Sequence, residues 1–279
     1  MTVFQTPEPI TIQLEVAVGE IVINATERAD TVVDVRPRVE SNGNDRKAAE
    51  KTTVEYANGR LKVKTPKWPL VGKGGTVDIT VDVPHGSALT GEGQVVDIRG
   101  DGRLGAVHYK IQHGGARFEQ TGTLTVDTGH GTLVVGQVSG PADLRTGSGE
   151  VSIGQVDGDA TVKNGNGRTR LGDVAGEVRV TAGNGEVEVE TAAAGVTIKN
   201  SHGDIRVGEV ARGTVLLNTT HGAVEVGIRQ GTAAWLKLKT VMGAVRNDLT
   251  TTDGPGQNEE TVEVHAHTGF GNITVRRAA

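Results

Sequence analysis

We predict an all-β protein, a parallel β-solenoid (β-helix-like) of ~18-residue rungs with an N-terminal antiparallel β cap. Three observations predict this fold. Glycine supplies 41 of the 279 residues. A Gly-x-Gly triplet returns every 18 residues, with its second glycine at Gly131, Gly149, Gly167 and Gly185, and position 203 continues the series. Between the triplets, apolar and polar residues alternate with the period of a strand that buries one face.

Each repeat is expected to form two short strands, which together make one rung of the solenoid. Counting from the leading glycine, apolar or small residues fall at positions 3 and 5 and again at 12, 14 and 16, a spacing of two. In the unit that starts at Gly149, these positions include Val151, Ile153 and Val162. One unit cannot bury its apolar face alone, so we expect successive rungs to stack in register.

Stacking in register makes a second prediction, because equivalent residues of neighbouring rungs become neighbours on one face. The outward positions should then alternate in charge. They do so in two columns: Glu150, Arg168 and Glu186, and then Arg170, Glu188, Arg206 and Glu225. We interpret these charges as ion-pair ladders. Three asparagines share position 16, where we expect them to point inward and bond turn carbonyls: Asn164, Asn200 and Asn218.

Residues 1–88 are predicted to form the N-terminal β cap, and residues 89–279 the solenoid. Alternating patterns predict cap strands at residues 11–18, 20–25, 31–36, 53–56, 60–64 and 77–83, with one or two helical turns in the polar stretch 41–52. Such a cap would cover the open end of the first rung. The segment GDGRLG matches a dinucleotide fingerprint in form, but a strand pattern follows it where that fingerprint needs a helix.

The end of the chain departs from the regular repeat. Residues 234, 236 and 238 are expected to face inward and Trp235 to face the opposite way. Residues 248–260 are rich in Thr, Asp, Gly and Asn and are predicted to form an insertion loop. The two strands around Gly269-Phe270-Gly271 are predicted to form the last rung, with Arg276 and Arg277 protecting its edge by charge.

Composition excludes several functions. The chain has no cysteine, so it has no disulfide, thiolate metal site or cysteine nucleophile. The formal charge is −5, with 29 basic and 34 acidic residues well mixed, which gives no footprint for nucleic acid. No window approaches the length of apolar residues that crosses a bilayer, and the first residues lack a secretion signal pattern. We expect a cytoplasmic protein without membrane insertion and without a cofactor.

The sequence resembles the actinobacterial "putative adhesin" family with β-strand repeats, a family of unknown function. The resemblance rests on FQTPEPITIQLEVAVGEIVI, VEYANGRLKVKTP, VDITVDVP, the Gly-x-Gly repeats, VGIRQGTAAWLKLKT and TVEVHAHTGFGNITVRR. It spans nearly the whole chain. It implies a β-solenoid fold and transfers no catalytic residue.

The candidate site residues are few. His113, His130, His202 and His221 each precede a leading glycine, so neighbouring rungs would bring them together in pairs within reach of a metal ion. The favoured interpretation of these histidines is structural, because this turn position suits residues that tolerate positive φ. Trp68 and Trp235 are candidate anchors for a partner. An acidic group near the mid-rung turn, Asp157, Asp159, Asp173 and Glu177, is the candidate for an enzyme.

These observations favour a non-enzymatic scaffold or protein-interaction protein that binds a protein partner or associates with itself. An adhesin-like protein that binds a carbohydrate or a surface is the first alternative. A self-assembling filament and a solenoid enzyme acting on polysaccharides are the others. Binding to purified cell-wall glycan would distinguish the first alternative, and metal binding or lost activity on substitution would distinguish the enzyme.

Overall fold

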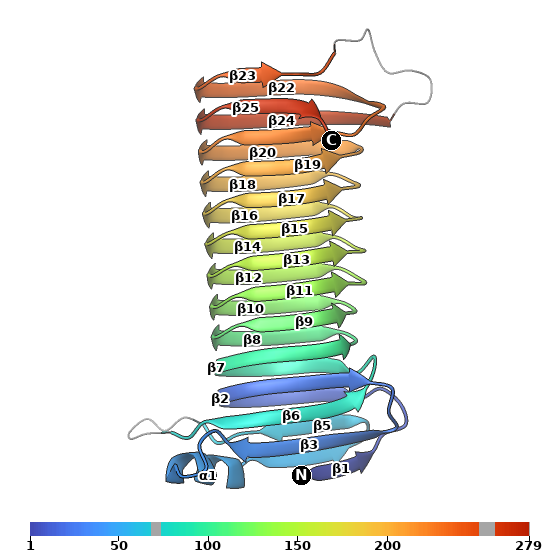
Figure 1. Ribbon diagram of the computed structural model, residues 1–279, viewed down its shortest axis with the longest axis vertical. Helices are drawn as coiled ribbons and strands as arrows, with labels where there is room; N and C mark the ends of the chain where they lie inside the picture. The colour runs from blue at the N-terminus through green and yellow to red at the C-terminus, as the bar shows by residue number, and fades with distance from the viewer. Residues whose placement is uncertain (68–73, 251–259, 279) are drawn as a thin grey trace. The chain divides into compact units, whose positions relative to one another are not determined.

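The computed structural model describes residues 1–67, 74–250 and 260–278. The chain divides into two compact units, Met1–Ser139 and Gly140–Ala279. Each unit contains parallel strands stacked as solenoid rungs, and an antiparallel region lies at the N-terminus (Figure 1). The predicted fold class is confirmed. Within the described ranges, no helix is long and apolar enough to cross a membrane.

The first unit combines the antiparallel region with the first rungs. Its elements are β1 (Thr2–Gln5), β2 (Thr11–Thr26), β3 (Asp30–Pro37), α1 (Gly43–Glu50), β4 (Thr53–Ala57), β5 (Arg60–Lys64), β6 (Val77–Pro84), β7 (Ala88–Arg103), β8 (Val107–His113), β9 (Ala116–Thr121), β10 (Leu124–His130) and β11 (Leu133–Val138). Antiparallel pairs join β1 to β3, β3 to β6 and β4 to β5. β2 pairs in parallel with β5, β6 and β7, so parallel stacking begins inside residues 1–88.

The segment 11–26 corrects one prediction. The sequence predicts two strands around a turn at Gly19, but β2 runs through this position without a break. A Cβ atom at Gly19 would lie 2.0 Å from the carbonyl oxygen of Val77 on the neighbouring strand. The glycine therefore permits close approach of two strands and does not make a turn.

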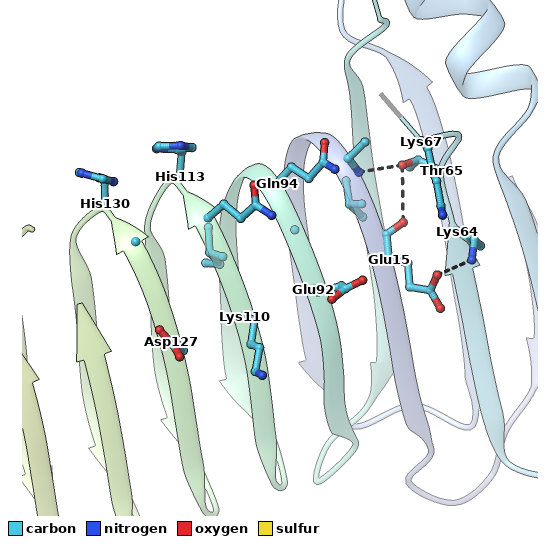
Figure 2. Close-up of a pocket in the computed structure, with 16 residues that line it drawn as sticks. Glu15, Lys64, Thr65, Lys67, Glu92, Gln94, Lys110, His113, Asp127 and His130 are labelled. Carbon is cyan, nitrogen blue, oxygen red and sulfur yellow. Dashed lines mark hydrogen bonds and ion pairs between the residues drawn. The ribbon is translucent and has the colours of Figure 1, made fainter. Parts of the chain in front are cut away.

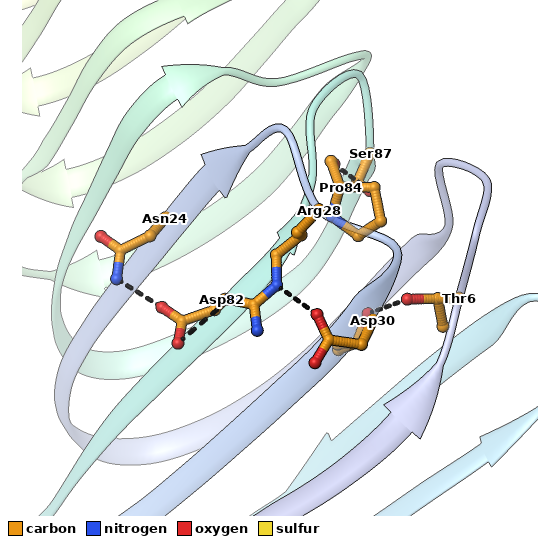
Figure 3. Close-up of polar contacts among 8 residues, drawn as sticks. Thr6, Asn24, Arg28, Asp30, Asp82, Pro84 and Ser87 are labelled. Carbon is orange, nitrogen blue, oxygen red and sulfur yellow. Dashed lines mark hydrogen bonds and ion pairs between the residues drawn. The ribbon is translucent and has the colours of Figure 1, made fainter.

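Polar contacts hold the N-terminal strands together (Figure 3). The Arg28 guanidinium bonds Asp30 at 2.9 Å and reaches Asp82 on β6 at 3.3 Å. Asn24 on β2 donates to Asp82 at 2.6 Å, and the hydroxyl of Ser87 donates to the carbonyl of Pro84 at 2.7 Å. These contacts fix the antiparallel strands against the first rungs.

The second unit contains the regular rungs. Its strands are β12 (Ala142–Ser148), β13 (Val151–Val156), β14 (Ala160–Asn166), β15 (Thr169–Val174), β16 (Val178–Asn184), β17 (Val187–Ala192), β18 (Val196–His202), β19 (Ile205–Val210), β20 (Gly213–His221), β21 (Val224–Ile228), β22 (Thr232–Met242), β23 (Val245–Asn247), β24 (Glu260–Phe270) and β25 (Ile273–Arg277). Residues 18 apart are register partners in parallel pairs, as predicted. Their inward side chains form the core; Val187 and Val189, for example, are fully buried.

Ion pairs between neighbouring rungs form within both predicted charge columns. Arg170 bonds Glu188 at 3.0 Å, and Arg206 lies 3.3 Å from Glu225. Arg168 pairs with Glu186 on the next rung. Because these arginines are about half exposed and their glutamates partly exposed, solvent screens each pair, which contributes less than about 1 kcal/mol. Their main effect is to favour the correct register.

Two of the three inward asparagines behave as predicted. Asn164 donates to the carbonyls of Gly149 and Gly167, each at 3.1 Å, and Asn200 donates to Gly185 at 2.9 Å. The prediction for Asn218 is wrong, because this residue is exposed and Thr219 takes the inward place beside Asn200. The repeat that starts at Gly203 is one residue longer than the others. Counting from its leading glycine therefore misplaces the second strand by one.

The order of the final rungs differs from their order in the sequence. β24 pairs with β20 on one side and with β22 on the other, and β25 lies in the same way between β21 and β23 (Figure 1). The predicted last rung is therefore internal, and β22 with β23 forms the terminal rung of the described part. Arg276 and Arg277 do not protect an edge: Arg276 bonds Glu225 at 2.8 Å, and Arg277 donates to the carbonyls of Arg229 and Thr232.

Candidate functional site

The candidate histidines meet in two pairs, as the repeat predicts. The rings of His113 and His130 stack with centroids 5.1 Å apart, and those of His202 and His221 with centroids 4.8 Å apart. Phe270 extends the second stack at 4.8 Å from His221. A shared metal ion needs nitrogen lone pairs that converge, whereas the in-plane lone pairs of stacked rings run side by side. Within the described residues, no three His, Asp or Glu side chains are grouped to hold a metal ion.

The structural interpretation of these histidines needs a different reason. Among the described residues, Asn58 is the one non-glycine residue with positive φ. The positive φ falls on the following glycines, at +121° for Gly114 and +131° for Gly203. The histidines are instead the last residues of their strands, where stacking of planar rings at the rung spacing holds them.

The acidic group near the mid-rung turn is divided among separate contacts. The Asp159 carboxylate accepts from the backbone N–H of Glu177 at 2.8 Å, one rung away. Glu177 itself pairs with Arg179, and Asp157 accepts from Gln155 at 2.8 Å. Asp97 and Asp204 make the same contact to the next rung as Asp159 does. These repeated contacts give the aspartates a role in joining rungs.

Of the two tryptophans, Trp68 lies outside the described residues. Trp235 is 69% exposed on the outward face of β22, opposite the inward Leu236, as the alternation predicts. The next outward residues of the strand are Lys237 and Lys239. Trp235 therefore remains a candidate anchor on the terminal rung.

The terminal rung ends the apolar core without covering it. Ile205, Val224 and Ile273 occupy equivalent places on successive rungs and are at most 1% exposed, but Val245 in the next place is 47% exposed. On the other strand, Leu236 follows Val264 in the same way and is only partly buried. Within the described part of the chain, β22 pairs only with β24, and β23 only with β25. No other described strand pairs with the outer edges of β22 and β23, so within the described ranges their outward backbone donors and acceptors are available for pairing.

A groove of about 690 Å³ lies within the first unit, on the outer side of β2, β7, β8 and β10. Figure 2 shows His113 and His130 along one side and a row of charged side chains that crosses the neighbouring strands. In register order, this row is Asp127, Lys110, Glu92, Glu15 and Lys64. Sequence reasoning missed the groove, because β2 and β7 lie far apart in the chain.

The charged residues of the groove, unlike those of the ladders, do not alternate regularly in sign from strand to strand. Glu15 bonds Lys64 at 2.5 Å, and this hydrogen bond lowers the pKa of Glu15 below its usual value. Glu92 stands directly beside Glu15, a like-charge contact that opposes folding. Among the described residues, Glu92, Lys110 and Asp127 are joined by no ion pair. Their hydrogen-bonding groups remain open to a ligand.

Comparison with known proteins identifies the family of this fold. A family model described as Toastrack DUF4097 matches residues 10–277. The chain belongs to the toastrack DUF4097 family. The match spans almost all of both units, and the function of this toastrack family is unknown. A comparison with curated proteins finds no match.

Several solved structures cover the toastrack chain at low identity. A putative cell adhesion protein from Clostridium sporogenes is 14% identical, covering 99% of this chain and 98% of its own, with a TM-score of 0.24. A putative adhesin from Bacteroides fragilis is 12% identical, with coverages of 98% and 95% and a TM-score of 0.33. A putative lipid binding protein from Parabacteroides distasonis is 11% identical, with coverages of 100% and 96% and a TM-score of 0.36. Likeness at this level does not transfer a function.

Proposed function

We propose that this toastrack protein is a non-enzymatic interaction scaffold whose binding element is the terminal rung, β22 with β23. The observation that carries the proposal is the exposure of Val245, which occupies a core position that is buried on the preceding rungs. Trp235, Val241 and Met242 add exposed apolar surface on the same rung. Apolar exposure gathered at an unpaired strand edge is typical of a surface that another molecule covers.

The charged outward columns of the second unit favour the terminal rung, and not the columns themselves, as the surface that binds a partner. In the second unit, Arg168, Arg170 and Arg206 are engaged with carboxylates of the next rung. A partner docking on those columns would have to break such pairs. At the terminal rung it would cover apolar side chains instead, which is favourable by about 25 cal/mol for each Å² buried.

A photo-crosslinking experiment tests the proposal. A photoreactive amino acid replaces Trp235 in one version of the full chain and Arg179 on β16 in another, and both are expressed in the cells that make the protein. Both positions are outward and exposed. We expect discrete crosslinked products from position 235 and none from position 179. No product at 235, or the same products at both positions, would contradict the proposal.

The groove favours a second candidate function, binding of a neutral oligosaccharide. Glu92, Lys110 and Asp127 offer two carboxylates and an ammonium to sugar hydroxyls, and the stacked His113 and His130 line the side of the groove. We expect NMR or calorimetric titration with a chitin oligosaccharide to show binding that Lys110→Ala weakens, with the exposed Lys199→Ala as the control. Equal binding by the two variants, or none by the wild type, would remove this candidate.

A further inference from the structure

We propose that the terminal rung accepts an extended segment of another protein as an additional parallel strand, and that this segment alternates apolar with acidic residues. The inference rests on the proposed function and names the partner of that same surface. Strand addition is a known mode of peptide recognition, in which backbone hydrogen bonds give affinity and alternate side chains give specificity.

The backbone supplies the first requirement. β22 is an 11-residue strand that pairs along almost its whole length with β24 on one side. Within the described ranges no strand pairs with its other side. An incoming strand would continue the parallel stack at the spacing of the existing rungs, about 4.8 Å.

The inward face supplies the second requirement. Leu236 and Leu238 face the core and are only partly buried, whereas Val264 and Ala266 beside them are at most 1% exposed. An added strand would complete the burial of both leucines if it carries apolar residues at every second position. Each rung of the chain covers the one before it in this way.

The outward face selects the charge. Lys237 and Lys239 are exposed, and among the described residues neither is joined to a carboxylate. Their neighbours on β24 are His265 and His267, which are not acidic. The internal columns place a carboxylate opposite a cation on the adjacent rung, as Glu188 stands opposite Arg170. By the same rule, the incoming strand carries Glu or Asp opposite Lys237 and Lys239.

The same lysines argue against a second copy of this rung as the occupant. Two copies of β22 paired about a two-fold axis near the middle of the strand would bring lysine against lysine. Lysines on an edge strand commonly prevent such self-pairing. A strand with acidic side chains would pair with the backbone groups of the edge and with the ammonium groups of the two lysines.

The test uses the full chain and a short fluorescein-labelled peptide of alternating Val and Glu. We expect saturable binding by fluorescence anisotropy, and binding weakened about tenfold or more in the double variant Lys237→Glu, Lys239→Glu. A peptide of alternating Val and Lys should show the reverse preference. The control variant Lys199→Glu, which changes an exposed residue on β18, should bind the acidic peptide as the wild type does.

A second probe separates strand addition from charge attraction alone. An acidic peptide with every backbone nitrogen methylated cannot donate to the strand ladder from either edge, so we expect it not to bind. Equal binding by the methylated peptide, an unchanged affinity of the double variant, or no binding to the wild type would overturn the inference. If crosslinking at position 235 still captures a partner, the proposed function stands and only the strand mode fails; if it captures none, both fail.

Discussion

Two buried threonine hydroxyl groups on different rungs of the second unit should affect stability in opposite directions. Thr146 and Thr268 are both inward threonines of the second unit and are 5% and 0% exposed. The hydroxyl of Thr268 donates to the carbonyl of Gly222 at 2.9 Å, whereas that of Thr146 has no partner. A buried polar atom without a partner lowers stability, and one with a partner raises it.

The first prediction compares valine at these two positions. Thr268→Val should lower the free energy of unfolding by about 1 kcal/mol, because it removes a hydrogen bond and leaves a carbonyl unpaired. Thr146→Val should leave the free energy unchanged or raise it by up to about 1 kcal/mol. Urea denaturation of both variants measures the difference. An equal loss in both would show that Thr146 has a partner in solution.

The leading glycines carry the second prediction. Gly167 has φ of +131°, and a Cβ atom there would lie 2.1 Å from the carbonyl oxygen of Gly149 on the previous rung. Gly231 has φ of +78° with nothing within 4 Å of such an atom. Gly167→Ala should cost about 2 to 4 kcal/mol, from backbone strain and overlap together, and Gly231→Ala about 1 kcal/mol from strain alone. Thermal unfolding of both variants tests this ranking, and equal losses would contradict it.

Residue patterns predict the rungs where the repeat length is constant and fail where it changes. The inward Asn164 and Asn200 follow from counting in steps of 18, but the one-residue longer repeat after Gly203 places Thr219 inward and Asn218 outward. The predicted turn at Gly19 is wrong, because the sequence alone does not distinguish a glycine needed for close approach of two strands from a glycine needed for positive φ.

At the scale of elements, Glu225 joins three successive strands. It bonds Arg276 on β25 at 2.8 Å and lies 3.3 Å from Arg206 on β19. The hydrogen bond from Arg276 holds the pKa of Glu225 below its usual value, although partial burial opposes this. The charged form is therefore favoured in the folded protein.

The third prediction follows from that pKa. Because the folded pKa is lowered, the contribution of Glu225 is complete above about pH 4.5, the unfolded value, and is lost as the pH falls through the folded value. Glu225→Gln should lower stability at pH 7 by less than about 1 kcal/mol and have no effect at the lowest pH. Denaturation curves from pH 7 to about pH 3 measure this convergence. A constant difference between variant and wild type across that range would contradict it.

The order of the final rungs could not be predicted from their sequences. β22 and β24 both carry alternating apolar residues, an inward threonine and a glycine three residues later: Thr240 with Gly243, and Thr268 with Gly271. Either strand fits on β20 by pattern alone. The choice depends on contacts between residues far apart in the chain, such as Arg276 with Glu225, which no local pattern contains.

At the scale of the whole molecule, the lysines of the terminal rung should keep the chain monomeric. We expect light scattering to give a mass near 29.0 kDa at all concentrations for the wild type. The double variant Lys237→Thr, Lys239→Thr removes the like charges from an open edge and should associate with rising concentration. Lys199→Thr is the matched control. A wild type that forms filaments, or a double variant that stays monomeric, would contradict this role of the lysines.

The groove was also beyond sequence reasoning, for a reason that concerns the whole chain. Glu15 and Glu92 are register partners, yet 76 residues lie between them in the sequence. Alternation predicts that each faces outward, but not that the two carboxylates meet. The repeat alone is enough to predict the fold class. To predict either candidate surface, one must also know which strands, far apart in the sequence, are neighbours in the fold.

The most direct test of the account is the position of the terminal rung, measured with engineered cysteines in a chain that has none of its own. Trp235 and Thr214 are each register partners of Glu263, on opposite sides of β24. Neighbouring strands lie about 4.8 Å apart and can be bridged by a disulfide, whereas strands two places apart cannot. We predict a disulfide in Trp235→Cys with Glu263→Cys and none in Trp235→Cys with Thr214→Cys. A bridge between positions 235 and 214 would place β22 directly on β20 and contradict the open terminal rung on which the proposed function depends.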